Sequence, residues 1–198
     1  MSVIVFILFS FALGISVFLL MRRCADASPL PLSSGLLVAF TLSIVHVTLF
    51  ILGILVGNQF QFADVENPDA VAKSNVMVFL GLAIVVAVKQ ALPYFGRKAQ
   101  PLTFDLNLGT SRVFVFTIAT GINGFLLGMG AGFVALLGAN IHKALWPFFA
   151  FTFILSFLGI MFGRQHVELR PRRWIVLSSL IMFATALFVV IFSTSLID

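Results

Sequence analysis

Four polar side chains lie in the middle of long apolar stretches of the sequence: Ser16, His46, Asn123 and Thr152. Polar and ionisable groups inside a membrane cost free energy, and in transporters they often mark the path of an ion or solute. Imidazole nitrogen and amide oxygen can also bind a divalent metal, so His46 and Asn123 are candidate, though weak, metal ligands. We therefore expect the four residues to line a substrate or ion path.

A structural explanation of the same residues stays open. A serine or threonine in a helix often donates its hydroxyl proton to a backbone carbonyl one turn earlier. An asparagine or a neutral histidine can instead form a hydrogen bond between two helices of a membrane bundle. The sequence alone does not choose between these explanations.

The composition determines which surroundings these residues have. The chain has 198 residues, of which 61% are hydrophobic and 10% charged, and its mean hydropathy is +1.15. A soluble domain of this length cannot bury so much apolar surface, so the composition predicts an integral membrane protein. We expect no enzyme and no cofactor, because the apolar stretches contain no acid pair, activated serine or cysteine–histidine pattern.

A helix needs about 20 apolar residues to cross the hydrocarbon layer of a membrane. Six stretches of the sequence meet this length, at about 2–21, 34–57, 75–95, 112–137, 143–163 and 174–196. The connections between them are short and rich in turn-forming residues. The sequence therefore predicts an all-α membrane protein with six transmembrane helices in a single domain, residues 1–198.

Lysine and arginine predict the orientation. The connections after the first, third and fifth stretches hold nine of them: Arg22, Arg23, Arg97, Lys98, Arg112, Arg164, Arg170, Arg172 and Arg173. The opposite side holds Lys73 and Lys143. By the positive-inside rule both termini lie outside, and the basic connections lie in the cytoplasm of a bacterial cell. There we expect them to meet anionic lipids of the cytoplasmic membrane rather than nucleic acid.

Two pairs of matching segments indicate an internal duplication. "GISVFLL" at 14–20 matches "GINGFLL" at 121–127, and "LGILVGNQ" at 52–59 matches "LGIMFGRQ" at 158–165 at nearly the same offset. Each copy holds three spans, so the second copy must enter the membrane from the opposite side. The matches predict a 3+3 inverted-topology repeat, about 1–95 and 108–198, with a site near the midplane between the copies.

Glycines recur at helical spacing within both predicted copies. Small residues at every fourth position let two helices approach closely in a membrane. We expect this role for seven glycines: Gly53, Gly57, Gly124, Gly128, Gly132, Gly159 and Gly163.

The chain resembles the bacterial manganese-efflux pumps of the lysine-exporter superfamily. The segments that carry the resemblance are "FALGISVF", "VFLGLAIV", "IATGINGFLLGMGAGF" and "FLGIMFGR". The resemblance implies a six-helix carrier that exports manganese or another divalent cation, which would be its substrate.

The same resemblance implies an altered ion site. The family has aspartates at the positions of Ser16 and Asn123, a glutamate at His46, and an arginine and a glutamate around Ala83 and Ala87. Manganese favours carboxylate and other hard oxygen ligands. The site expected here is therefore poor in acids.

Two functions follow as hypotheses. The repeat and the small-residue faces favour a transporter of the manganese-efflux type with an altered site. The missing acids favour a transport-inactive membrane scaffold, or a subunit of a larger membrane complex, that kept the fold. A homo-oligomer or another membrane protein is a possible partner in either case.

Overall fold

In the computed structural model, residues 2–60, 68–95, 110–134, 141–167 and 169–194 are described. They form six helices and no strand: α1 (Ser2–Ala27), α2 (Leu32–Gln59), α3 (Pro68–Phe95), α4 (Thr110–Phe133), α5 (Ile141–Arg164) and α6 (Pro171–Thr194). All six are long and apolar enough to cross a membrane. The predicted all-α fold with six transmembrane helices is therefore confirmed.

Several helices begin or end at other residues than the sequence predicted. α1 continues six residues past the expected end at 21, so that Arg22 and Arg23 lie in its last turns instead of in a connection. α3 begins seven residues earlier than expected, at Pro68. Proline suits the first helical position because its missing N–H would have no partner there. The end of the fourth predicted span, at 135–137, lies outside the described residues.

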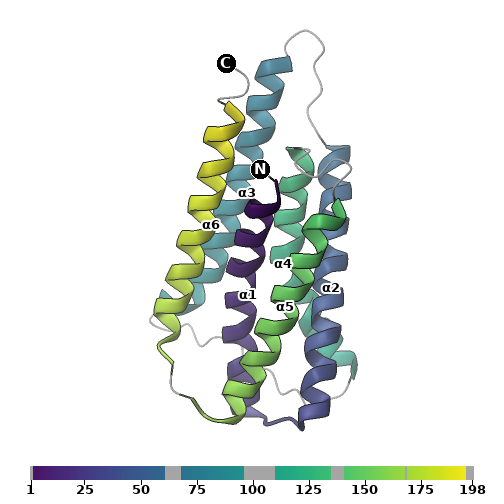
Figure 1. Ribbon diagram of the computed structural model, residues 1–198, viewed down its shortest axis with the longest axis vertical. Helices are drawn as coiled ribbons and strands as arrows, with labels where there is room; N and C mark the ends of the chain where they lie inside the picture. The colour runs from purple at the N-terminus through teal and green to yellow at the C-terminus, as the bar shows by residue number, and fades with distance from the viewer. Residues whose placement is uncertain (1, 61–67, 96–109, 135–140, 168, 195–198) are drawn as a thin grey trace.

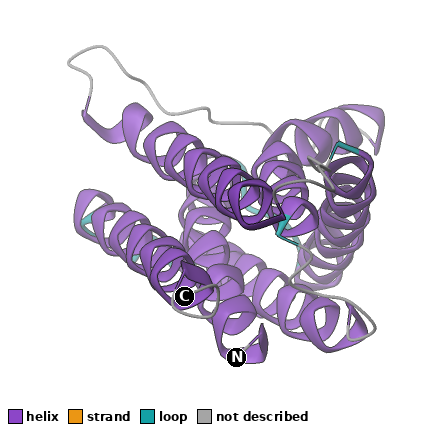
Figure 2. Cartoon of the chain, turned by 90° about the horizontal axis from the view of Figure 1, so that it is seen from above, coloured by secondary structure: helices purple, strands orange, loops and turns teal. Residues whose placement is uncertain are grey.

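The helices stand side by side along the long axis of the molecule and alternate in direction (Figure 1). Figure 2 shows the same bundle of helices from above. α1 packs mainly against α5, α2 against α4, and α3 against α6. Further contacts join α1 to α6, α3 to α4, and α2 to α5. Exchanging α1, α2 and α3 for α4, α5 and α6 returns the same set of pairs, as a duplicated chain would produce. The inverted repeat itself stays a prediction.

The α2–α4 pair is held at close range by glycines. Gly53 and Gly57 of α2 face the backbone of α4, and Gly128 and Gly132 of α4 face the backbone of α2. A Cβ atom added to Gly132 would lie 2.9 Å from the backbone nitrogen of Asn58. Any side chain at these positions would therefore push the two helices apart. Such close contact lets the two backbones gain van der Waals attraction where no hydrophobic force joins them.

Glycines hold the α1–α5 pair in the same way. Gly159 faces the backbone of Phe18, as Gly53 faces the backbone of Phe125. Gly159 follows Gly53 by 106 residues, and Phe125 follows Phe18 by 107. Gly163 lies against the backbone of Arg22. Gly124 differs from the others, because an added Cβ there would meet the ring of Phe148, at 3.2 Å.

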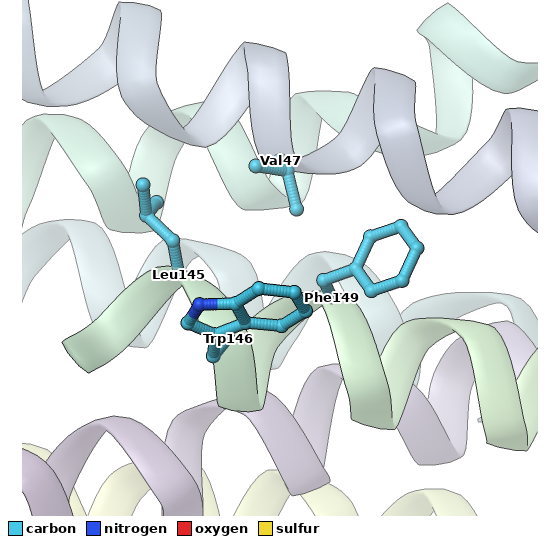
Figure 3. Close-up of a pocket in the computed structure, with 4 residues that line it drawn as sticks. All are labelled: Val47, Leu145, Trp146 and Phe149. Atoms are coloured by element: carbon cyan, nitrogen blue, oxygen red, sulfur yellow. The ribbon is translucent and has the colours of Figure 1, made fainter. Parts of the chain in front are cut away.

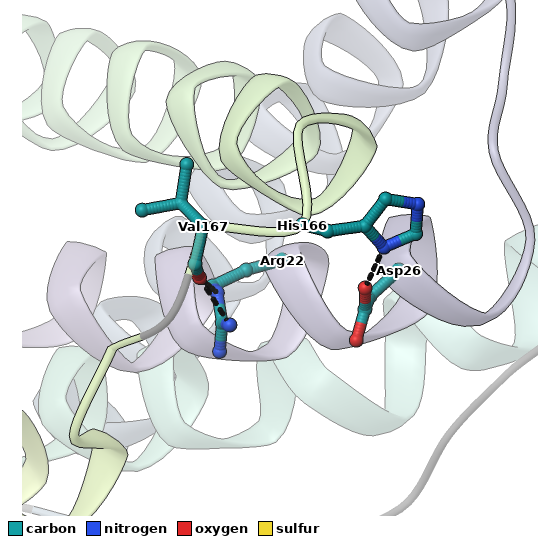
Figure 4. Close-up of polar contacts among 4 residues, drawn as sticks. All are labelled: Arg22, Asp26, His166 and Val167. Atoms are coloured by element: carbon teal, nitrogen blue, oxygen red, sulfur yellow. Dashed lines mark hydrogen bonds and ion pairs between the residues drawn. The ribbon is translucent and has the colours of Figure 1, made fainter.

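The last turns of α1 are tied to the segment that follows α5 (Figure 4). The Arg22 guanidinium donates from Nε to the carbonyl oxygen of Val167 at 3.0 Å, and its Nη2 donates to the same oxygen. Nearby, His166 Nδ1 lies 2.6 Å from Asp26 Oδ1. These contacts close the α1–α5 pair at one end of the bundle.

Replacing Arg22 with alanine is expected to destabilise the protein by about 1 kcal/mol, the usual net contribution of a hydrogen bond. Asp26→Asn should have a smaller effect, because the ion pair is exposed and solvent screens it. The thermal midpoint in detergent, followed by circular dichroism, measures both. Arg164→Ala serves as the control, since Arg164 is exposed at the end of α5. Equal midpoints for Arg22→Ala and Arg164→Ala would contradict this role of Arg22.

Candidate functional site

Ser16 and Asn123 lie on helix faces that meet α3. Ser16 comes two turns after Phe9 on α1, and the Phe9 ring packs edge-on against Phe79 of α3, with centroids 5.7 Å apart. Asn123 comes two turns before Gly130 on α4, where an added Cβ would lie 2.9 Å from the same Phe79 ring. Residues seven apart share one face of a helix. Ser16 and Asn123 therefore lie on the faces of α1 and α4 that contact Phe79, each two turns away from that contact.

The part of α3 that faces them is mostly apolar. One to two turns along from Phe79, α3 presents Ala83, Val86 and Ala87, which are all buried. One turn further stands Gln90, which is 5% exposed. The methyl groups of Ala83 and Ala87 carry no polar atom, so Gln90 is the amide that α3 brings to this region.

Gln90 takes part in a chain of polar contacts that joins three helices. The hydroxyl of Ser178 in α6 donates to the carbonyl oxygen of Ala12 in α1 at 2.7 Å and lies 3.2 Å from the Gln90 amide. The hydroxyl has one proton, and the shorter contact uses it. As placed, the Gln90 amide turns its Oε1 atom to Ser178. Amide nitrogen and oxygen are assigned from hydrogen bonding alone, and because the Ser178 proton is used by Ala12, we assign the donating NH₂ group of Gln90 to the Ser178 side.

The other end of the Gln90 amide is buried and has no hydrogen-bond partner among the described residues. With the donating group turned to Ser178, this free end is the oxygen. The Asn123 Oδ1 atom is likewise buried and unpartnered within the described chain. Gln90 of α3 and Asn123 of α4 thus each hold a buried acceptor atom whose bonding capacity is unused.

Gln90 is not among the residues that the sequence predicts for the site. It stands near the end of the third apolar stretch, beside Lys89, and has no polar counterpart at the repeat offset. A signal was nevertheless present, since Ser178 and Ser179 place two hydroxyls in the sixth stretch, where a buried amide can find a partner.

His46 is fully enclosed at the α2–α4 interface. Its Nδ1 atom lies 2.8 Å from the carbonyl oxygen of Leu42. A carbonyl only accepts, so Nδ1 carries the proton and Nε2 keeps a free lone pair. Nε2 is buried and makes no hydrogen bond to the described residues. The backbone of Thr120 in α4 also contacts the imidazole, so the ring joins α2 to α4.

The structure does not bring His46 and Asn123 together as a pair of metal ligands. An added Cβ on Gly121 would lie 3.8 Å from His46 Nδ1, so His46 faces the Gly121 flank of α4. Gly121 and Asn123 are two residues apart and point about 200° away from each other around the helix. His46 and Asn123 thus lie on different flanks of α4.

The remaining two predicted residues use their hydroxyl protons within their own helices. Ser16 donates to the carbonyl oxygen of Leu13 at 2.7 Å, and Thr152 donates to that of Phe148, also at 2.7 Å. Thr152 faces a carbonyl four residues earlier, as His46 does. For Ser16 and Thr152 the structural explanation therefore accounts for the observed bonds, while their oxygens keep lone pairs that can still accept.

No cluster of three or more His, Cys, Asp or Glu side chains that could hold a metal occurs in the part of the chain that the structure describes. Among the described residues, the buried acceptors without a partner that could face a cation are instead neutral: the Asn123 and Gln90 amides and, on the other flank of α4, the His46 imidazole. Such a set can orient a cation and its water molecules but cannot neutralise it.

A separate cavity of about 320 Å³ lies between α2 and α5 (Figure 3). It is lined by Val47, Leu145, Trp146 and Phe149. All four side chains are apolar or aromatic, and Trp146 is 72% exposed. This lining suits lipid chains rather than a polar solute, so the cavity belongs to the lipid-facing surface.

Comparison with known families gives one match. A family model described as "Putative manganese efflux pump" matches residues 30–190. The matched range includes His46, Gln90, Asn123 and Thr152, whereas Ser16 precedes it. Neither a search of curated proteins nor a search of solved structures gives a match to this chain.

Proposed function

Since this chain belongs to the manganese efflux pump family, we propose that it is a carrier that exports manganese or a related divalent cation along a polar path between its two three-helix units. The family is one of membrane transporters, and the six apolar helices make the chain an integral multi-pass membrane protein. Membership of a transporter family also favours transport over catalysis.

The observation that carries the proposed path is the buried, unpartnered Oδ1 atom of Asn123. It lies in the segment "IATGINGF", on the face of α4 that meets α3. An unpaired polar atom inside a membrane protein is costly unless a substrate or water satisfies it. Ser16 faces the same region from α1, and His46 and Thr152 line the neighbouring α2–α4 and α5 surfaces.

Alternating access provides the mechanism. In inverted-repeat carriers the two units rock against each other around a site near the midplane, which opens to one side of the membrane at a time. The pairing of α1 with α5 and of α2 with α4 supports such a division, because each pair joins one helix from each unit. Close glycine contacts give smooth surfaces along which these helices can shift.

The proposed location is a bacterial cytoplasmic membrane with both termini outside. Arg170, Arg172 and Arg173 gather at the start of α6 around a hollow that is also lined by Leu169, Pro171 and Val176. Guanidinium groups beside apolar side chains suit the phosphate and the upper acyl chain of an anionic lipid. This supports a cytoplasmic position for that end of the bundle.

A transport-inactive scaffold or subunit is the second candidate. The observation in its favour is the lack of a carboxylate cluster among the described residues, because the family resemblance implies acids at the positions of Ser16, His46 and Asn123. The same experiment decides between the two functions.

In vesicles that contain the purified protein, wild type is expected to move manganese down an imposed gradient. Asn123→Ala should reduce the initial rate at least tenfold, because about 1.4 kcal/mol of lost interaction corresponds to a factor of ten. A manganese-quenched dye inside the vesicles measures the rate, and Asn58→Ala, at an exposed position of α2, is the matched control. An unchanged rate in Asn123→Ala would overturn the site.

Failure of wild type to transport manganese, cobalt or zinc, together with stable co-purification of another membrane protein, would instead support the scaffold.

A further inference from the structure

We infer that Gln90 of α3 is a further substrate-binding residue, and that with Asn123 it forms a neutral centre that binds a divalent cation through the water molecules of its hydration shell. The inference rests on the proposed function, since it concerns the same path. Neither the family match nor the sequence pattern assigns a role to Gln90.

The polar contacts place Gln90 at the level of Ser16. The Ala12 carbonyl points along α1 toward residue 16, whose N–H is its helical partner. The Ser178 hydroxyl that donates to this carbonyl also contacts the Gln90 amide. Gln90, Ser178 and Ser16 therefore occupy one layer of the bundle.

Asn123 lies close to the same layer. Ser16 is two turns from Phe9, and Asn123 is two turns from Gly130. Phe9 and Gly130 both face Phe79 of α3. α1 and α3 run in one direction along the bundle and α4 in the other, so both steps lead away from Phe79 toward the same end (Figure 1). The long side chain of Gln90 spans the remaining turn of α3.

The bonding of Gln90 differs from that of a purely structural amide. Structural glutamine in a membrane interior normally satisfies both ends of its amide, because no solvent is there to do so. Here Ser178 satisfies one end, and the other end is buried without a partner in the described structure. Anchoring through α6 fixes the direction of the free end, as a preorganised binding group requires.

The neutral character of the centre determines how it binds a cation. Manganese and magnesium are hard ions that prefer oxygen ligands, and magnesium in particular gives up its water reluctantly. Amide oxygens supply no net charge to repay the loss of water, so the ion keeps its inner shell. Its water molecules then donate hydrogen bonds to the Gln90 and Asn123 oxygens, and such bridged contacts are nearly as favourable as direct ones.

The test uses the full-length protein in vesicles, with manganese as the probe and two readouts: the transport rate and the manganese-induced rise in thermal midpoint. Gln90→Leu is expected to lower the rate at least tenfold and to abolish the rise. Gln59→Leu, at the exposed end of α2, should change neither. Cobalt hexammine, whose bound ammonia does not exchange, mimics a hydrated ion and should compete with manganese for wild type.

Each result of this test supports or overturns the role of Gln90. Normal transport by Gln90→Leu overturns the role of Gln90. If the leucine variant does not fold, Gln90→Glu replaces it, and the Ser178 proton then has to turn from Ala12 to the carboxylate. The added charge should raise manganese affinity at least tenfold, and unchanged affinity overturns the assignment. Transport without competition by cobalt hexammine overturns binding through the hydration shell.

If wild type does not transport but manganese stabilises it in a Gln90-dependent way, the proposed function fails and the binding centre stands. If wild type neither transports manganese nor is stabilised by it, the proposed function and the binding centre are both wrong.

Discussion

Gly128→Ala is expected to lower the free energy of unfolding by about 1–3 kcal/mol. The new Cβ would meet the backbone of Phe50 in α2, where the carbonyl carbon would lie 2.9 Å away. A backbone atom cannot rotate out of the way as a side chain can, so α2 and α4 must separate. The thermal midpoint in detergent measures the loss, and transport activity should fall with it.

Gly81→Ala is the matched control. An added Cβ at Gly81 meets nothing within 4 Å, and the residue lies on the exposed face of α3. Alanine favours a helix over glycine by roughly 1 kcal/mol, so this variant should equal wild type or exceed it in stability. Gly163→Ala should behave like Gly128→Ala, because Gly163 meets the backbone of Arg22 in the α1–α5 pair. A loss as large in Gly81→Ala as in Gly128→Ala would show that close packing is not the cause.

The second large effect concerns charge. The double variant Ser16→Asp with Asn123→Asp is expected to raise the apparent affinity for manganese at least tenfold, since the family resemblance implies aspartates at both positions. Carboxylates are preferred manganese ligands and also neutralise the ion. The measurement is the dependence of transport rate on manganese concentration in vesicles.

Ser10→Asp provides the control for this variant. Ser10 is also buried in α1, but it lies six residues from Ser16, on a different face of the helix. Burying an acid there carries a similar cost in the membrane without adding a ligand to the path. The proposed path is contradicted if the double variant binds manganese no better than wild type, or if Ser10→Asp produces the same gain.

Much of the fold could be predicted because its main determinants act locally. The length of an apolar stretch decides whether a helix crosses the membrane, and this can be counted in the sequence. The glycine spacing at Gly53, Gly57 and Gly128 indicated close helix contacts before the partners were known. The helix bounds were less accurate, because hydropathy does not mark where Pro68 starts α3 or where the last turns of α1 end at Ala27.

The site was less predictable because it depends on which helix faces meet. Depth in the membrane groups His46 with Asn123, but the Gly121 contact places His46 on another flank of α4. Gln90 could not be predicted, because it is a single amide near the end of a span. Only the Ser178 contact, between residues 88 positions apart, reveals its place. Such contacts across helices leave little trace in the order of residues along one chain.

The pairing of helices has a consequence for biosynthesis. α1 finds its main partner only in α5, which ends 137 residues after α1 does, from Ala27 to Arg164. At a synthesis rate of about 5–20 residues per second, α1 waits roughly 7–27 s in the bilayer before that partner is complete. Insertion of α1 must therefore precede its association with α5, and the α1 surface that later meets Gly159 and Gly163 stays without its main partner during this time.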